Sequence, residues 1–235
     1  NRWPGMTMGQ WGTHFDRTCT WWEQGRAWMA SVTRCQFLLQ QGSFVADAAY
    51  FDGESAPAEF PVGKPALPVG YDYDGLSAGV LWRASVSQGR LVLPSGMSYR
   101  VLILPPAQRT MTPGLLRKLA GLVHEGLTLI GPPPQASPSL QDYPECDTEV
   151  QHLAAEMWGK CDGHRVSEHR YGSGKVVWGP PLARVLAELE LKPDFEYPAG
   201  TGAQLAFIHR REGEAEIYFV SNQPHQFTRL GRANV

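Results

Sequence analysis

The residues best suited to chemistry are gathered near the N-terminus, in the stretch GTHFDRTCTWWEQ at 12–24. Five of its side chains could line a binding site: His14, Arg17, Trp21, Trp22 and Glu23. Aromatic faces stack on the C–H faces of sugar rings, while charged side chains hydrogen-bond to hydroxyl groups. This stretch therefore predicts the wall of a carbohydrate site.

A purely structural explanation of the same residues competes with that prediction. Thr20 and Glu23 have the S/T-x-x-E spacing of a capping box, which predicts a helix that begins at Thr20. In this interpretation Glu23 orders the start of the helix, and Trp21 and Trp22 belong to its packed face. Spacing alone leaves both interpretations open. The cap already gives Glu23 a sufficient role, so we do not expect it to be the catalytic carboxylate.

Other candidate residues offer less. Ser95 lies in the turn PSGMS between Pro94 and Gly96, which favours turn formation over a nucleophile. His209 lies on a predicted strand beside Arg210, and we expect no second ligand or carboxylate to accompany it, which favours a solvated or hydrogen-bonded histidine. No Cys/His pattern typical of zinc is present, and we predict no metal ligands. The four cysteines, too few for a disulfide scaffold, are expected to be reduced.

The composition limits the class of protein. Hydrophobic residues make up 43% and charged residues 19% of 235 residues, enough apolar side chains for one large domain or two ordinary ones. A net charge of -2 gives no electrostatic reason to expect binding to nucleic acid or to an anionic membrane. No apolar run approaches the roughly 20 residues of a membrane span.

Periodicity and turn residues predict an α/β chain. A helix is expected from Thr20 to Gly42, followed by a strand at 44–51 and a proline-rich linker. Further helices are predicted near 76–82, 113–125, 147–158 and 181–189, the third capped by Asp147, with strands at 90–93, 99–104, 127–130 and 175–178. Short apolar strands separated by helices indicate a buried parallel sheet, and 205–221 is expected to form an antiparallel hairpin.

The turns that follow the predicted strands exclude several functions. They read LPP and IGPPP, and no glycine-rich phosphate loop or nucleophile elbow is present. Proline removes the backbone N–H donors that a phosphate or oxyanion site needs. We therefore expect neither a nucleotide site nor a covalent nucleophile in residues 71–190. A flavin site stays a weaker alternative without a phosphate loop.

Several segments in order resemble one known family. PGMTMGQWGTHFDRTCTWWEQGRAWMASVTRCQFLLQQGSFVADAAYFDGESAP, GRLVLPSGMSYRVLILP and IHRREGEAEIYFVSN are similar to glycoside hydrolase family 106, the α-L-rhamnosidases. The resemblance implies an inverting hydrolase of terminal α-L-rhamnose in plant glycans or glycosides. It also implies a calcium ion near the sugar, whose ligands we cannot assign here, and a catalytic acid and base that precede Asn1.

The resemblance implies a domain organisation too. Residues 1–51 would be the last helix and strand of a (β/α)8 barrel. Residues 52–193 would form a flavodoxin-like domain, similar to glutamine amidotransferases but without their nucleophile, and 194–235 would open a β-sandwich. The chain would then be an inactive piece of a secreted or periplasmic enzyme that binds a rhamnose-containing carbohydrate, of unknown oligomeric state. The alternative is a non-catalytic assembly module of a multidomain carbohydrate-active protein.

Overall fold

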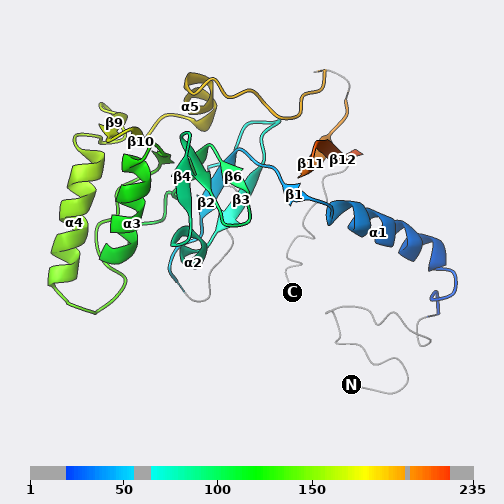
Figure 1. The fold of residues 1–235 in the computed structure, drawn as a ribbon, viewed down its shortest axis with the longest axis horizontal. Helices are drawn as coiled ribbons and strands as arrows, with labels where there is room; N and C mark the ends of the chain where they lie inside the picture. The colour runs from blue at the N-terminus through cyan, green and yellow to red at the C-terminus, as the bar shows by residue number, and fades with distance from the viewer. Residues whose placement is uncertain (1–19, 56–64, 199–201, 223–235) are drawn as a thin grey trace, which may run out of the picture.

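A six-stranded sheet forms the centre of the protein in the computed structural model, which describes residues 20–55, 65–198 and 202–222 (Figure 1). Across the sheet the strands run β3 (Tyr73–Leu76), β2 (Ala48–Phe51), β7 (Val101–Ile103), β8 (Thr128–Ile130), β10 (Gly174–Val177) and β9 (Glu168–Tyr171). All neighbouring pairs are parallel except β10 with β9. Counted along the chain, the five parallel strands lie in the order 2-1-3-4-5. The predicted α/β class and parallel sheet are confirmed.

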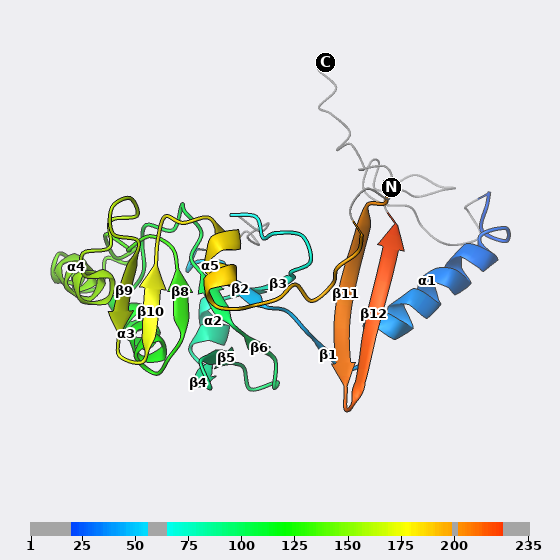
Figure 2. The ribbon, with the colours of Figure 1, turned by 90° about the horizontal axis from the view of Figure 1, so that it is seen from above.

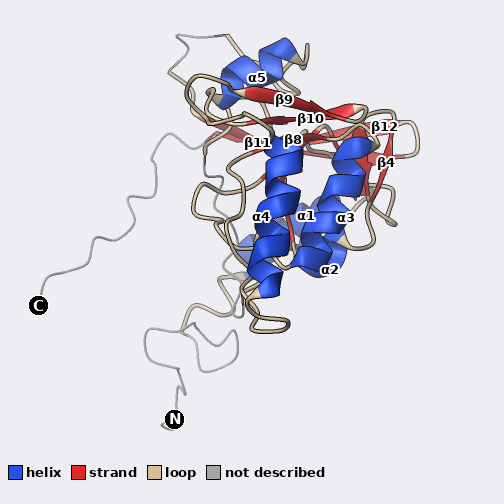
Figure 3. Cartoon of the chain, turned by 90° about the vertical axis from the view of Figure 1, so that its left-hand side faces the viewer, coloured by secondary structure: helices blue, strands red, loops and turns tan. Residues whose placement is uncertain are grey.

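Helices cover both faces of this sheet. α2 (Ala78–Leu81), α3 (Pro113–His124) and α4 (Glu145–Trp158) lie on one side of the strands, and α5 (Leu182–Glu188) lies on the other (Figure 3). Side chains alternate between the two layers, as a pleated strand requires. Ala49 and Phe51 of β2 pack in the core beneath α3 and α4, whereas Ala48 and Tyr50 pack with α5.

Two smaller antiparallel sheets complete the described fold. β4 (Ser85–Ser87), β5 (Arg90–Val92) and β6 (Ser98–Tyr99) form one of them. In the other, β1 (Ser43–Phe44) pairs with β11 (Leu205–Glu212), which pairs in turn with β12 (Ala215–Asn222). This predicted hairpin is confirmed, and it lies beside the six-stranded unit, near helix α1 (Arg26–Leu39) (Figure 2).

Two helix starts differ from the prediction. α1 begins at Arg26 after an N-cap at Gly25 that has no side-chain hydrogen bond. Residues 20–25 form a separate turn, closed by the N–H of Gly25 on the carbonyl of Trp21 at 2.8 Å, so the expected capping box is wrong. α4 begins at Glu145, and Asp147 lies within its first turn, where its carboxylate accepts a hydrogen bond from the Ser137 N–H at 2.8 Å.

The strand expected at the end of a barrel has a different place. Residues 44–51 divide into β1 and β2, and β2 pairs with β3 and β7 inside the six-stranded sheet. A boundary at residue 51 would cut this sheet, because its first strand in chain order precedes the proline-rich linker. The α/β unit therefore includes β2.

Two further expectations concerned reduced cysteines and the lack of a membrane-spanning segment. Cys35, Cys146 and Cys161 are free, and Cys19 lies outside the described residues. Among the residues that the structure describes, we find no helix with the length and apolar character needed to cross a membrane.

Candidate functional site

The N-terminal corner of the described chain carries exposed aromatic side chains. The ring of Trp21 is 40% exposed and meets the ring of Trp28, 52% exposed, edge to face at a centroid distance of 6.1 Å. The Trp21 ring packs closely on Gly25, where a Cβ atom would lie 3.0 Å from the ring. α1 buries none of its residues within this chain, so the described residues do not enclose the two tryptophans in a core. The corner therefore presents two partly exposed indole rings.

The five predicted site residues are only partly visible. Trp22 is half-buried and Glu23 is exposed in the turn that precedes α1. Glu23 lies three residues before the first helical residue and does not cap the helix. His14 and Arg17 lie outside the described residues, so their part in the site stays a prediction. With the capping role gone, the Glu23 carboxylate is left facing solvent beside Trp21 and Trp22.

A second polar cluster surrounds His209, which is a hydrogen-bonded strand histidine as expected, although the carboxylates beside it were not predicted. The imidazole is 2% exposed and lies between two carboxylates. Its Nδ1 is 2.7 Å from Asp194 Oδ2, and its Nε2 is 2.6 Å from Glu216 Oε2. The ring of Tyr218 stacks on it at 4.1 Å, and the Tyr218 hydroxyl donates to the other oxygen of Asp194 at 2.8 Å.

This geometry makes the cluster structural. Each ring nitrogen of His209 is held in a hydrogen bond to a carboxylate oxygen. With both nitrogens occupied and the ring buried, His209 has no free nitrogen with which to take a proton from a substrate. The Glu216 pKa is lowered by its hydrogen bonds to His209 and Arg211, and burial and then Asp194 raise the pKa of Tyr218 to about 12. The cluster ties the hairpin to the segment that follows α5.

Part of the cluster was within reach of sequence reasoning. A two-residue turn at Gly213–Glu214 fixes a register that sets His209 opposite Tyr218 and Arg211 opposite Glu216. That register would have placed a carboxylate on the same face as the histidine. Asp194 comes from a distant loop, and no local pattern indicates it.

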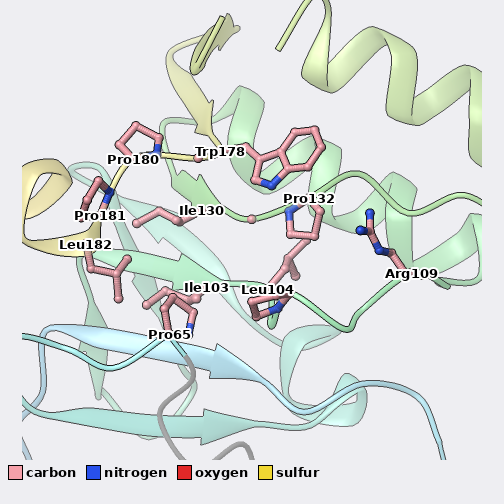
Figure 4. Close-up of a pocket in the computed structure, with 13 residues that line it drawn as sticks. Pro65, Ile103, Leu104, Arg109, Ile130, Pro132, Trp178, Pro180, Pro181 and Leu182 are labelled. Atoms are coloured by element: carbon pink, nitrogen blue, oxygen red, sulfur yellow. The ribbon is translucent and has the colours of Figure 1, made fainter. Parts of the chain in front are cut away.

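A third feature is a cavity of about 340 Å³ at the carboxyl ends of β7, β8 and β10 (Figure 4). This edge is where open α/β sheets bind ligands. Apolar residues dominate its lining, and the list is Pro65, Ile103, Leu104, Pro106, Arg109, Ile130, Gly131, Pro132, Trp178, Gly179, Pro180, Pro181 and Leu182. The cavity thus lies at the strand ends where the sequence predicted no phosphate site.

The calcium ion implied by the family resemblance finds no fitting ligands in the visible part of the chain. Within residues 20–55, 65–198 and 202–222, no three His, Cys, Asp or Glu side chains are grouped so that they could hold a metal ion. Around His209, the carboxylate oxygens of Asp194 and Glu216 are already hydrogen-bonded. We therefore assign no metal to these residues.

Comparison with known proteins extends over almost the whole chain. A protein of Formosa agariphila named "Putative beta-glucuronidase" is 37% identical over 219 residues, which is 93% of this chain and 18% of that protein. The solved structure of a rhamnosidase from Novosphingobium sp. PP1Y is 36% identical, with a TM-score of 0.77. That similarity covers 94% of this chain and 21% of the rhamnosidase chain.

The chain therefore spans about a fifth of the length of these relatives. The family model of glycoside hydrolase family 106, described as alpha-L-rhamnosidase, matches residues 1–232 without leaving out either the N-terminal corner or the hairpin. Sequence and structure thus agree that this chain belongs to glycoside hydrolase family 106, the α-L-rhamnosidase family.

Proposed function

We propose that this chain is part of an inverting α-L-rhamnosidase that removes terminal α-L-rhamnosyl residues from plant glycans or glycosides. One observation carries the proposal: the family match includes the stretch 12–24, and in its described part Trp21 and Glu23 are exposed while Trp22 is half-buried. Exposed indole faces beside a free carboxylate suit the C–H faces and hydroxyls of a sugar.

In this proposal the N-terminal corner binds and does not catalyse. His14, Arg17, Trp21, Trp22 and Glu23 form one wall of the sugar site. An inverting enzyme needs an acid and a base roughly 6.5–9.5 Å apart, on opposite faces of the sugar ring. Other parts of the longer protein supply both carboxylates, so the 235-residue chain alone is inactive.

The domain roles follow the same proposal. The segment up to α1 closes a catalytic (β/α)8 barrel, and the α/β unit from β2 to α5 is a flavodoxin-like domain. The 2-1-3-4-5 strand order, which is that of the flavodoxin type, supports the second assignment. The β11–β12 hairpin begins a β-sandwich. We further propose secretion or a periplasmic location, because polysaccharides are degraded outside the cytoplasm.

Substrate choice is tested with two chromogenic glycosides. The names of the two relatives point to different sugars, a rhamnoside and a β-glucuronide. The longer protein should hydrolyse p-nitrophenyl α-L-rhamnoside, with the anomeric configuration inverted in the NMR spectrum of the first product. Hydrolysis of p-nitrophenyl β-D-glucuronide alone, or retention at the anomeric carbon, would overturn the proposal.

The sugar-wall role is tested by Trp21→Ala in the longer protein. Loss of one stacking face should lower kcat/KM on the rhamnoside by about tenfold, which corresponds to ~1.4 kcal/mol. The matched control is Trp82→Ala, since Trp82 is 49% exposed on α2's C-cap, in the α/β unit. A fall in melting temperature with unchanged kinetics would show that Trp21 only packs.

A second candidate function is an assembly module. One observation favours it: α1 exposes Phe37 and Leu38, which are 64% and 45% exposed in this chain. In that case Phe37→Ser in the longer protein would weaken its association without a kinetic effect. Activity on a rhamnoside together with an inert Phe37→Ser variant would exclude this candidate.

A further inference from the structure

The cavity at the strand ends has a shape and lining that the sugar chemistry does not use. It belongs to the α/β unit, where Leu104, Gly131 and Trp178 directly follow the ends of β7, β8 and β10. Leu182 closes it from the start of α5. Its volume of about 340 Å³ is within the range of small-molecule sites. A ligand there would sit at the edge of the sheet on which α/β domains bind their ligands.

The lining excludes two large ligand classes. Five of the lining residues are prolines, which have no N–H, and the N–H groups of Gly131 and Trp178 already donate to Val177 and Ser167. A phosphate group would therefore find few of the backbone donors it needs. The lining holds no hydroxyl, amide or carboxylate side chain, and its polar side-chain groups are the Arg109 guanidinium and the Trp178 indole N–H. Most hydroxyls of a buried sugar would therefore lack partners, at a cost of about 1–3 kcal/mol each.

The ligand class that fits this lining best is a flat, apolar molecule. The prolines and the indole of Trp178 offer rigid surfaces that lose little side-chain entropy when a ligand binds. Contacts outside the cavity also hold two of its wall residues, Gly131 and Trp178, in place. The Trp158 indole N–H donates to the Gly131 carbonyl at 2.9 Å, and a Cβ atom at Gly163 would meet the Trp178 ring at 2.7 Å. A preformed wall of this kind favours an aromatic ring that stacks on it.

One charged group selects the ligand further. Arg109 lies at one end of the cavity, beyond Pro132 (Figure 4). No carboxylate of the described residues forms an ion pair with its guanidinium. A guanidinium next to an apolar wall matches a carboxylate attached to a ring. We infer that this cavity is a binding site for aromatic monocarboxylates, separate from the sugar site of the N-terminal corner.

The experiment uses the full-length protein and two isosteric probes. trans-Cinnamate carries the charge and trans-cinnamamide does not; each is titrated by saturation-transfer NMR. Cinnamate should bind about fivefold more tightly than the amide, the upper range for an exposed ion pair. Arg109→Gln should abolish that preference and leave amide binding within twofold. Arg170→Gln, a change at another exposed arginine on β9, should alter neither.

A second variant tests the cavity itself. Leu182→Trp fills the space from α5 and should remove binding of both probes, while thermal unfolding reports whether the variant is folded. Should that variant fail to fold, the Arg109→Gln comparison alone decides. The inference is overturned if neither probe binds, as expected were another segment of the protein to fill the cavity, if the two bind equally, or if Arg109→Gln leaves the cinnamate preference intact.

Discussion

Asp47 is a half-buried residue whose surroundings disfavour the charged form of its carboxyl group. It precedes β2, and its backbone carbonyl accepts a hydrogen bond from the N–H of Arg100 at 2.7 Å. Its side-chain atom Oδ2 is buried without a hydrogen-bond partner. Burial, together with the charge of Asp194, raises the pKa of Asp47 from 3.8 to about 6, although Arg90 and Arg100 pull it down. The folded state therefore favours the protonated carboxyl group.

The change Asp47→Asn removes this cost. Because the folded pKa lies above the unfolded one, wild-type protein loses stability as the pH rises from about 4 to 6, and the loss stays constant above that. The pKa rise converts to ~3 kcal/mol as an upper bound. Partial solvent exposure reduces the expected figure to about 1–2 kcal/mol. The variant should thus gain that much over wild type between pH 4 and pH 7.

Urea unfolding at a series of pH values between 4 and 7.5 measures the effect. The informative quantity is how the difference between variant and wild type changes with pH, since any packing effect of the amide adds a constant. Asp162→Asn is an opposite-sign control, because three backbone N–H groups lower the Asp162 pKa and its removal should destabilise near neutral pH. A difference for Asp47→Asn that does not change between pH 4 and 7 would refute the reasoning.

Two further predictions concern the hairpin and the strand ends. The Glu216 pKa is lowered by His209 and then by Arg211, so the stability that ionised Glu216 contributes is present above about pH 4.5 and is lost as the pH falls. Hydrogen exchange of residues 205–222 should therefore accelerate on acidification, and Glu216→Gln should remove that pH dependence. Gly179→Ala should destabilise by ~3 kcal/mol or more in thermal unfolding, because φ is +103° and the new Cβ would lie 2.0 Å from the Gly163 carbonyl oxygen. Gly96→Ala, with φ +88° and open space around it, should cost only about 1 kcal/mol, and equal effects would contradict the clash.

The strands and helices of the α/β unit were predictable because their signals are local. Apolar runs such as 127–130, closed by glycine and proline, marked buried strands, and Pro113 marked a helix start. The partner of a strand is not a local property. The run 44–51 looks the same whether it ends a barrel or begins a parallel sheet, and only its pairing with β3 and β7 decides.

In the candidate site, too, some features could be predicted from local sequence and others depend on the fold. The clustering of Trp21, Trp22 and Glu23 was visible in the sequence, but whether Glu23 caps a helix depended on where helix nucleation succeeds. Nucleation fails at Thr20, because residues 20–25 close a turn of their own before Arg26. The surroundings of His209 depended on hairpin register, which is local, and on Asp194, which is not.

The strand-end prolines show how far an absence in the sequence can be taken. LPP and IGPPP excluded a phosphate cradle because proline has no N–H to donate. The same residues have rigid apolar rings, and three strand ends bring them together around one cavity with Trp178 and Arg109. A motif search detects only that N–H donors are missing. The fold shows, in addition, that these prolines form part of an apolar cavity lining. In this α/β unit, the prolines that disfavour a phosphate ligand also form the apolar lining proposed to bind an aromatic one.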